Sequence, residues 1–163
     1  MTKIQKRRRR ENKTDYLKRL KLLKSEKPRI VFRKTNKYLI AQYVESNEAQ
    51  DKVIFGINSK DLLKHGWDEK AKGSLKSVTA SYLTGYFAGK KILKEKLETP
   101  IVDLGMIRVL HKTKVFAFIK GLIDAGVKIP SKGEAFPEED RLNGEHLKNK
   151  IDVKKIKLSL EKI

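Results

Sequence analysis

Residues 29–46, RIVFRKTNKYLIAQYVES, decide the fold class of this chain. Residues 29–34 and 38–46 are rich in Ile, Val, Phe and Tyr, which favour strands, and the polar residues 35–37 between them predict a hairpin turn. After a polar loop over residues 47–51, residues 52–59 predict a third strand. Consecutive strands with short connections usually lie side by side, so the segment predicts an antiparallel three-stranded meander.

Helical patterns follow the meander. Residues 61–64 predict a short helix that ends at Gly66, residues 67–76 a polar loop, and residues 77–97 the longest helix. Glycine destabilises a helix by about 1 kcal/mol relative to alanine. The small residues of the helix over residues 77–97 are therefore expected to let it pack closely on the sheet. These small residues are Ser81, Gly85 and Gly89. The apolar side of the helix is marked by Val78, Tyr82, Tyr86, Leu93 and Leu97.

A fourth strand over residues 101–104 and a second amphipathic helix over residues 114–125 complete the core. The inward side of this helix is expected to hold Val115, Phe116, Ile119, Leu122 and Ile123, and Gly126 ends it. The order of elements predicts an α/β fold in which a mixed sheet, formed by the antiparallel meander and then helix, strand and helix, carries helices on its faces.

The two ends of the chain differ from this core. The predicted organisation is a basic arm over residues 1–27, an α/β core over residues 28–130 and a helical C-terminal extension over residues 131–163. In the extension, an acidic helix start at residues 138–140 follows a loop, and Asp152 is positioned to cap a last helix. The apolar side of that helix is expected to contain Val153, Ile156, Leu160 and Ile163.

Charge limits the classes of function. The 163 residues include 39 Lys and Arg against 20 Asp and Glu, a net charge of +19, and there is no cysteine. A disulfide scaffold and a thiol nucleophile are therefore excluded. No apolar run approaches the roughly 20 residues that span a bilayer, and the first residues do not resemble a secretory signal, so a cytoplasmic protein without a membrane partner is expected.

More than half of the net charge lies in residues 1–29, which contain 13 Lys and Arg and three acids. Four consecutive arginines at positions 7–10 repel one another, so this segment is expected to be extended or disordered until an anion neutralises it. Residues 14–24 predict a short basic helix that becomes ordered on a partner. Such a pattern favours a polyanionic partner over a solvated tail.

Motifs for catalysis are weak. The segment 85–91, GYFAGKK, resembles a phosphate loop, but its glycines are one residue too close and it lies inside a predicted helix. The three histidines at positions 65, 111 and 146 have no partner at metal-ligand spacing. A ribonuclease H-like nuclease would need several converging carboxylates, and Asp103 is the single acid in the fourth strand. We therefore expect neither an enzyme nor a bound cofactor or metal.

Binding to RNA fits the residues better. The basic arm can release counterions from a phosphate backbone, which confers affinity without specificity. Specific recognition of RNA uses stacking and polar groups, and the hairpin is rich in both. Because side chains alternate along a strand, Arg33 and Phe32 should point to opposite faces. The candidate hairpin residues are Arg33, Asn36, Lys37, Tyr38, Gln42 and Tyr43.

Five blocks of the chain resemble the archaeal form of the large-subunit ribosomal protein L-eighteen family. They are RRRRENKTDY at 7–16, KPRIVFRKTNKYLIAQ at 27–42, ASYLTGYFAGKK at 80–91, VFAFIKGLIDAGVKIP at 115–130 and FPEEDRLNGEHL at 136–147. Two departures are Ser74 after Gly73, where the family has Asn, and residues 110–113, which lack its glycine-containing turn. The resemblance implies a structural protein that binds 5S rRNA and helps attach it to large-subunit rRNA in the central protuberance.

The predicted RNA-binding residues follow from the matching blocks and from the loop after the third strand. They are Arg7, Arg8, Arg9, Arg10, Lys13, Tyr16, Arg33, Asn36, Lys37, Ser59, Lys72 and Lys76. The expected partners are 5S rRNA, large-subunit rRNA and neighbouring ribosomal proteins, and the expected location is the cytoplasmic ribosome. The alternative is a basic protein-interaction or chaperone module with an acidic protein partner. The acidic segment 134–140 is either a docking site for a basic partner or a solvated loop.

Overall fold

The computed structural model describes residues 4–48, 50–146 and 151–161. Its elements are α1 (Arg7–Arg10), α2 (Tyr16–Lys24), β1 (Arg29–Lys34), β2 (Leu39–Asn47), β3 (Gln50–Asn58), the 3-10 helices η1 (Ser59–His65) and η2 (Glu69–Ser74), α3 (Val78–Lys94), β4 (Ile101–Asp103), α4 (Lys114–Asp124), the 3-10 helix η3 (Gly133–Ala135), α5 (Glu139–Asn143) and α6 (Val153–Glu161). The predicted α/β class and the order of its elements are confirmed.

The sheet has the order β3-β2-β1-β4. Strands β1, β2 and β3 form the predicted antiparallel meander, while β4 pairs with β1 in parallel, with Val31 beside Asp103. The polar loop expected over residues 47–51 is wrong, because β2 runs to Asn47 and pairs there with Gln50, the first residue of β3. Ser46 and Asp51 face each other in these strand ends and hydrogen-bond at 2.8 Å, which satisfies both polar groups within the ladder.

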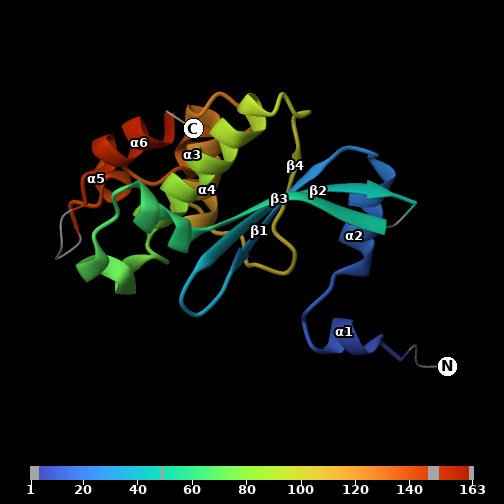
Figure 1. Cartoon of the computed structure of the whole chain (residues 1–163). Coiled ribbons are helices and arrows are strands. Elements are labelled where there is room, and N and C mark those ends of the chain that lie inside the picture. The colour runs from blue at the N-terminus through green and yellow to red at the C-terminus, as the bar shows by residue number, and fades with distance from the viewer. Residues whose placement is uncertain (1–3, 49, 147–150, 162–163) are drawn as a thin grey trace.

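The two faces of the sheet are covered differently. Figure 1 shows α3 and α4 on one side of the strands, with α5 and α6 beyond them, and the N-terminal helices on the other side. The core lies between the sheet and the helix pair, where Phe32 of β1 stacks on Phe118 of α4 with ring centroids 4.5 Å apart. The opposite face holds the alternate residues of β1, among them Arg29 and Arg33.

The small residues of α3 pack on α4 and not on the sheet, so that prediction is wrong. A Cβ added to Gly85 would collide with the carbonyl group of Phe118, and a Cβ added to Gly89 would meet Ala125. Ser81 donates a hydrogen bond to the Lys114 carbonyl oxygen at 2.6 Å. The two helices run parallel because both follow strands of the same direction, and small residues let their backbones approach closely.

Two local expectations also need correction. Residues 67–76 are not a plain polar loop: Trp67, Ala71 and Leu75 are buried, and the Trp67 indole donates to the Ala71 carbonyl oxygen at 3.2 Å, which stabilises η2. Leu93, expected on the apolar side of α3, is exposed in its last turn, where the neighbouring Ile92 is buried instead.

The C-terminal helices cover α3. Asp152 caps α6 by accepting from the Lys155 amide at 3.0 Å, and Val153, Ile156 and Leu160 are buried as predicted. Ile163, expected beside them, lies outside the described residues. The hydroxyls of Tyr82 and Tyr86 in α3 donate to Asp124 and Glu161, which ties α3 to both α4 and α6.

Candidate nucleic-acid interface

The four arginines of the arm form one helical turn, α1, and not the extended segment expected from their repulsion. Nearby side-chain oxygens offset the repulsion between the four guanidinium groups. Arg8 Nε donates to Thr14 Oγ1 at 3.0 Å, Arg9 lies 3.3 Å from the Asp15 carboxylate, and Glu11 lies within ion-pair distance of Arg7. Asn12, at a φ of 52°, reverses the chain after this turn.

The predicted basic helix is present as α2, and Asp15 caps it. The Asp15 carboxylate accepts from the amides of Leu17 and Lys18 at 3.1 and 3.2 Å. The hydrogen bond from Lys18, together with the nearby Arg9 charge, lowers the pKa of Asp15 despite partial desolvation. The outer side of α2 is apolar and open to solvent, since Leu17 and Leu20 are 74% and 51% exposed.

Polar contacts join the arm to the sheet, and no residue of α1 or α2 is buried. Arg19 Nη2 lies 3.1 Å from Asp51 at the end of the β2–β3 hairpin, and Lys18 Nζ donates to the Gly105 carbonyl oxygen at 3.3 Å. Arg9 reaches the Met106 sulfur at 3.6 Å. Side-chain cations therefore hold the arm both to the end of the β2–β3 hairpin and to the connection after β4, and no hydrophobic core does so.

Beneath the arm, Arg29 forms a buried ionic network. Its guanidinium lies 2.7 Å from Asp51, 2.8 Å from the Ser46 hydroxyl and 3.3 Å from Asp103. Partial burial opposes the ionisation of Asp51, but the Ser46 hydrogen bond and the charges of Arg29 and Arg19 outweigh it, so the pKa of Asp51 falls below its usual value. Asp51 thus joins a buried cation to a cation of the arm.

Arg33 lies in β1, within the strand predicted over residues 29–34, and its guanidinium is held in place there. Its Nη1 donates to the carbonyl oxygens of Phe32 and Asp103 at 2.8 and 2.9 Å, and its Nη2 lies 3.4 Å from the Asp103 carboxylate. Gly105, with a φ of 57°, rests on the guanidinium so closely that a Cβ would stand 2.9 Å from Arg33 Cζ. The guanidinium is therefore preorganised, with its side chain still 40% exposed.

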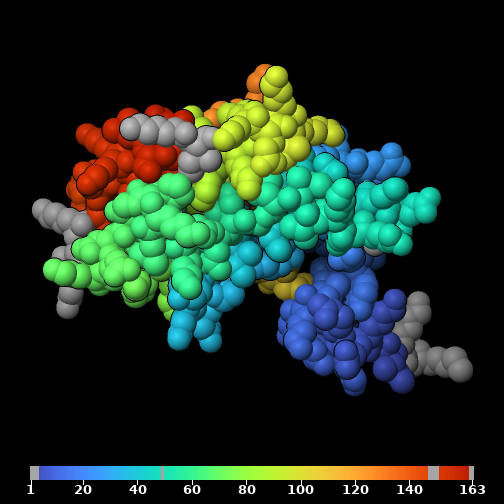
Figure 2. All heavy atoms as spheres, viewed as in Figure 1, coloured from blue at the N-terminus to red at the C-terminus, as the bar shows by residue number. Residues whose placement is uncertain are grey.

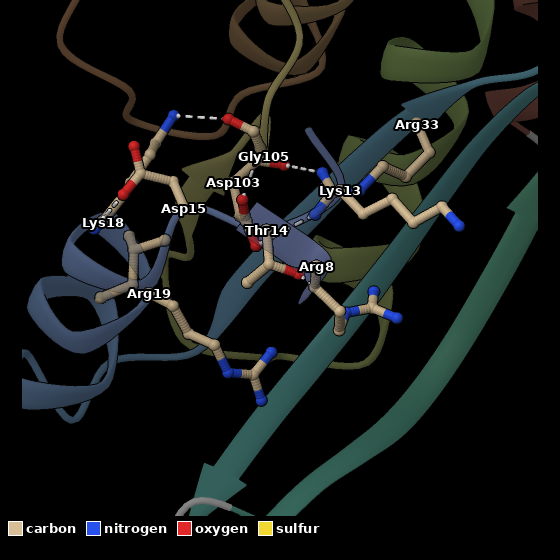
Figure 3. A pocket seen from close by; sticks show the side chains of 10 residues that line it. Arg8, Lys13, Thr14, Asp15, Lys18, Arg19, Arg33, Asp103 and Gly105 are labelled. Atoms are coloured by element: carbon tan, nitrogen blue, oxygen red, sulfur yellow. Dashed lines mark hydrogen bonds and ion pairs between the residues drawn. The ribbon is translucent and has the colours of Figure 1, made fainter. Parts of the chain in front are cut away.

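A cavity of about 170 Å³ lies between the arm and this part of the sheet (Figure 3). The sticks in Figure 3 come from the arm, β1 and the end of β4, segments that are far apart in the sequence. Five cations line the cavity against the two carboxylates of Asp15 and Asp103. These cations are Arg8, Lys13, Lys18, Arg19 and Arg33. The excess of positive charge suits a phosphate group.

The hairpin turn is held by Thr35. Its amide donates to the Tyr38 carbonyl oxygen at 2.8 Å, and its hydroxyl accepts from the Tyr38 amide at 2.9 Å. Asn36 and Lys37 stand exposed at the tip, and neither side chain has a hydrogen-bond or ion-pair partner within the described part of the chain. The turn keeps its shape without them, so both side chains are available to a ligand.

The remaining predicted residues are scattered. Tyr16 is partly exposed, with the Lys6 ammonium 4.7 Å from its ring centre. Lys72 pairs with Glu69 at 3.1 Å, and Lys76 is exposed before α3. Ser59 is fully buried, and its hydroxyl accepts from the Leu39 amide at 3.1 Å, so it stabilises the meander and is not available to RNA.

Sequence reasoning missed Lys18, Arg19 and Lys114. Lys18 and Arg19 were hidden in a generally basic helix, and only the three-dimensional contacts with Gly105 and Asp51 single them out. Lys114 starts α4, and in α/β folds the starts of helices that follow parallel strands meet at one edge of the sheet. That rule could have drawn attention to it.

Other ligand classes find little support in the described residues. Within residues 4–48, 50–146 and 151–161, no group of three His, Cys, Asp or Glu side chains is placed to hold a metal ion. His65 and His111 lie edge-on against Phe87 and Phe116, as packed surface histidines do. No helix in the same ranges has the length and apolar character needed to cross a bilayer.

Comparison with known proteins decides the family. A family model described as "Ribosomal large subunit proteins 60S L5, and 50S L18" matches residues 2–100, well over half of the chain. The chain belongs to this ribosomal protein family. It is 43% identical over 145 residues to the large ribosomal subunit protein uL18 of Korarchaeum cryptofilum, an alignment that covers 89% of this chain and 72% of that protein.

A second archaeal relative agrees. The chain is 44% identical over 142 residues to the large ribosomal subunit protein uL18 of Thermofilum pendens, with 87% of this chain and 70% of the relative covered. The resemblance inferred from the five sequence blocks is therefore confirmed. The uL18 family is a family of structural components of the large ribosomal subunit, and the ribosomal role predicted for this chain holds at that level.

Proposed function

We propose that this protein binds 5S rRNA and helps attach it to large-subunit rRNA in the central protuberance, as a structural component without catalytic chemistry. One observation carries the proposal. The arm and the tip of the β1–β2 hairpin project from the same side of the molecule, and gold residues of the connection before α4 are visible in the recess between them (Figure 2).

This composite surface combines two kinds of contact. The arm supplies long cationic side chains, those of Arg7 to Arg10 and Lys13. They bind phosphates with release of counterions, which confers affinity. The hairpin supplies Asn36 and Lys37 on a turn whose shape Thr35 maintains, and Arg33 adds a guanidinium held by Asp103. Such preorganised groups lose little entropy on binding, so they are suited to discriminate one RNA shape from another.

In this proposal the three segments predicted along the chain have separate roles. Residues 1–27 act as the RNA-binding arm, residues 28–130 as the α/β core that presents the hairpin, and residues 131–163 as an extension on α3. Tyr16, Lys72 and Lys76 remain proposed RNA contacts, whereas Ser59 is withdrawn because it is buried. Neighbouring ribosomal proteins are the further proposed partners, within the cytoplasmic ribosome.

The salt dependence of RNA binding tests the arm. Each neutralised phosphate contributes about −0.7 to −0.9 to the slope of log K against log salt. Deleting residues 1–13 removes seven basic residues and one acid, so the slope measured with 5S rRNA should become shallower by several units. An unchanged slope would exclude the arm as the phosphate-binding element.

Specificity tests the function itself. The full-length protein should bind 5S rRNA more tightly than an unrelated RNA of the same length, at a salt concentration where non-specific binding is weak. Equal affinity for both RNAs would favour a general polycation. A complex that is purified from cells and survives ribonuclease treatment would favour an acidic protein partner.

A further inference from the structure

A second basic groove lies on the helix-covered side of the sheet, away from the cavity beneath the arm. It has a volume of about 440 Å³, within the range of about 300 to 1,000 Å³ that is usual for sites of small organic molecules. Its walls are the end of β1, the starts of α3 and α4, and the connection that precedes α4. Alternation along β1 separates the two sites, because Lys34 points into this groove and Arg33 into the other.

The floor of the groove is apolar. Phe32, Val78 and Val115 form its inner part, and Ile107 and Leu110 of the connection form its outer wall. Leu110 is 47% exposed, although it is large and apolar. A partly open apolar surface of this kind accepts the face of a planar ring, as unstacked bases require.

The rim of the groove is cationic. Lys34, Arg108, Lys112, Lys114 and Arg141 line it, and Lys112 has an acidic partner, Glu138, at 2.9 Å. Within the described ranges, no acidic side chain pairs with Lys34, Lys76, Arg108 or Lys114. Burial, with the charges of Lys34 and Lys76, lowers the pKa of Lys114. Lys34 and Lys114 thus line the groove together without an acidic partner, and a bound anion would relieve their mutual repulsion.

We propose that this groove binds one unstacked nucleotide of an rRNA segment distinct from the segment that meets the arm. The phosphate contacts Lys34 and Lys114, and the base lies on the apolar floor beside Leu110. This inference rests on the proposed RNA-binding function. The groove is continuous with that surface, because Lys34 is two residues from Asn36 at the hairpin tip and Ile107 is next to Met106, which contacts the arm.

Crosslinking locates the nucleotide without altering the protein. Ultraviolet irradiation of purified large ribosomal subunits, followed by mass spectrometry of the crosslinked peptides, should yield rRNA nucleotides attached within residues 107–115. Attachment of rRNA to the arm and hairpin but not to residues 107–115 would overturn this inference and leave the proposed function intact. Attachment of that segment to a neighbouring protein alone would also overturn it. A lack of rRNA on the arm and hairpin would instead count against the proposed function.

A matched pair of variants measures the contribution of the groove. Lys34→Gln combined with Lys114→Gln should weaken binding to large-subunit rRNA at least tenfold and make the salt slope shallower by about 1.5. The control combines Lys60→Gln with Lys128→Gln, which removes the same charge at exposed positions outside the groove and should change affinity less than twofold. Equal losses in both pairs would reduce the groove to part of the general positive charge and overturn the proposal.

Discussion

Gly85 of α3 lies directly on the backbone of Phe118 in α4, so closely that a single added carbon would collide with the carbonyl oxygen. This contact brings the two helices together over the sheet, and Phe118 in turn stacks on Phe32. The packing of the core therefore depends on the absence of a side chain at position 85.

Gly85→Ala should destabilise the protein despite the better helix propensity of alanine. Overpacking a close contact typically costs about 1 to 3 kcal/mol, which exceeds the roughly 1 kcal/mol gained by replacing glycine in a helix. The change is measured by urea denaturation. Gly73→Ala is the control, since no atom lies within 4 Å of its added Cβ. A Gly85→Ala protein as stable as the wild type would show that α3 and α4 can move apart freely.

Asp103→Ala should destabilise the fold by about 3 kcal/mol, because it leaves the buried guanidinium of Arg29 with one carboxylate in place of two and removes the ion pair with Arg33. Thermal and chemical denaturation measure the loss. The comparison is Glu69→Ala, which breaks the exposed pair with Lys72 and should change stability by less than about 1 kcal/mol. Similar effects of both substitutions would argue against an energetic role for the buried network.

Acid should release the arm from the sheet. In the folded protein the pKa of Asp51 lies below its usual value of 3.8, so this carboxylate stabilises the folded state above pH 3.8 and loses that contribution as the pH falls through the folded pKa. Protonation weakens the attraction for Arg19, and the amides of α2 should exchange faster with solvent. In Asp51→Asn the exchange of α2 should be fast already at neutral pH, and the acid transition that remains should be the one that belongs to Asp15, the cap of α2. Slow exchange of α2 in this variant would show that other contacts hold the arm.

The hairpin tip should contribute to specificity and not to stability. Asn36→Ala should lower affinity for 5S rRNA by about 1 kcal/mol, more than for an unrelated RNA, and leave the melting temperature unchanged. Thr35→Ala is the informative contrast, because it removes the hydroxyl that holds the turn and should lower the melting temperature. A stability loss in Asn36→Ala would make that residue structural.

Local patterns were sufficient for the strands, for α2 and for the cap of α6, because alternation, helical spacing and a capping Asp act over a few residues. They could not reveal the partners of Arg29, since Asp51 and Asp103 come from other strands and the parallel pairing of β4 brings Asp103 into place. Gly85 illustrates a related limit: its small size predicts close packing, but the identity of the neighbour depends on the fold. Ser59, predicted at the end of the third strand as an RNA contact, is buried beside the Leu39 amide, and that long-range partner could not be predicted from the local sequence.

The parallel pairing of β1 with β4 has a consequence for synthesis of the chain. Strand β1 can pair with β2 as soon as the first hairpin emerges, but its other edge stays open until residues 101–103 follow. At translation rates of about 5 to 20 residues per second, the interval from Asn47 to Asp103 is roughly 3 to 11 s. An open strand edge is a template for pairing with other chains, so the nascent protein passes through a period of higher aggregation risk, which falls when the three-residue β4 covers part of the longer β1 edge.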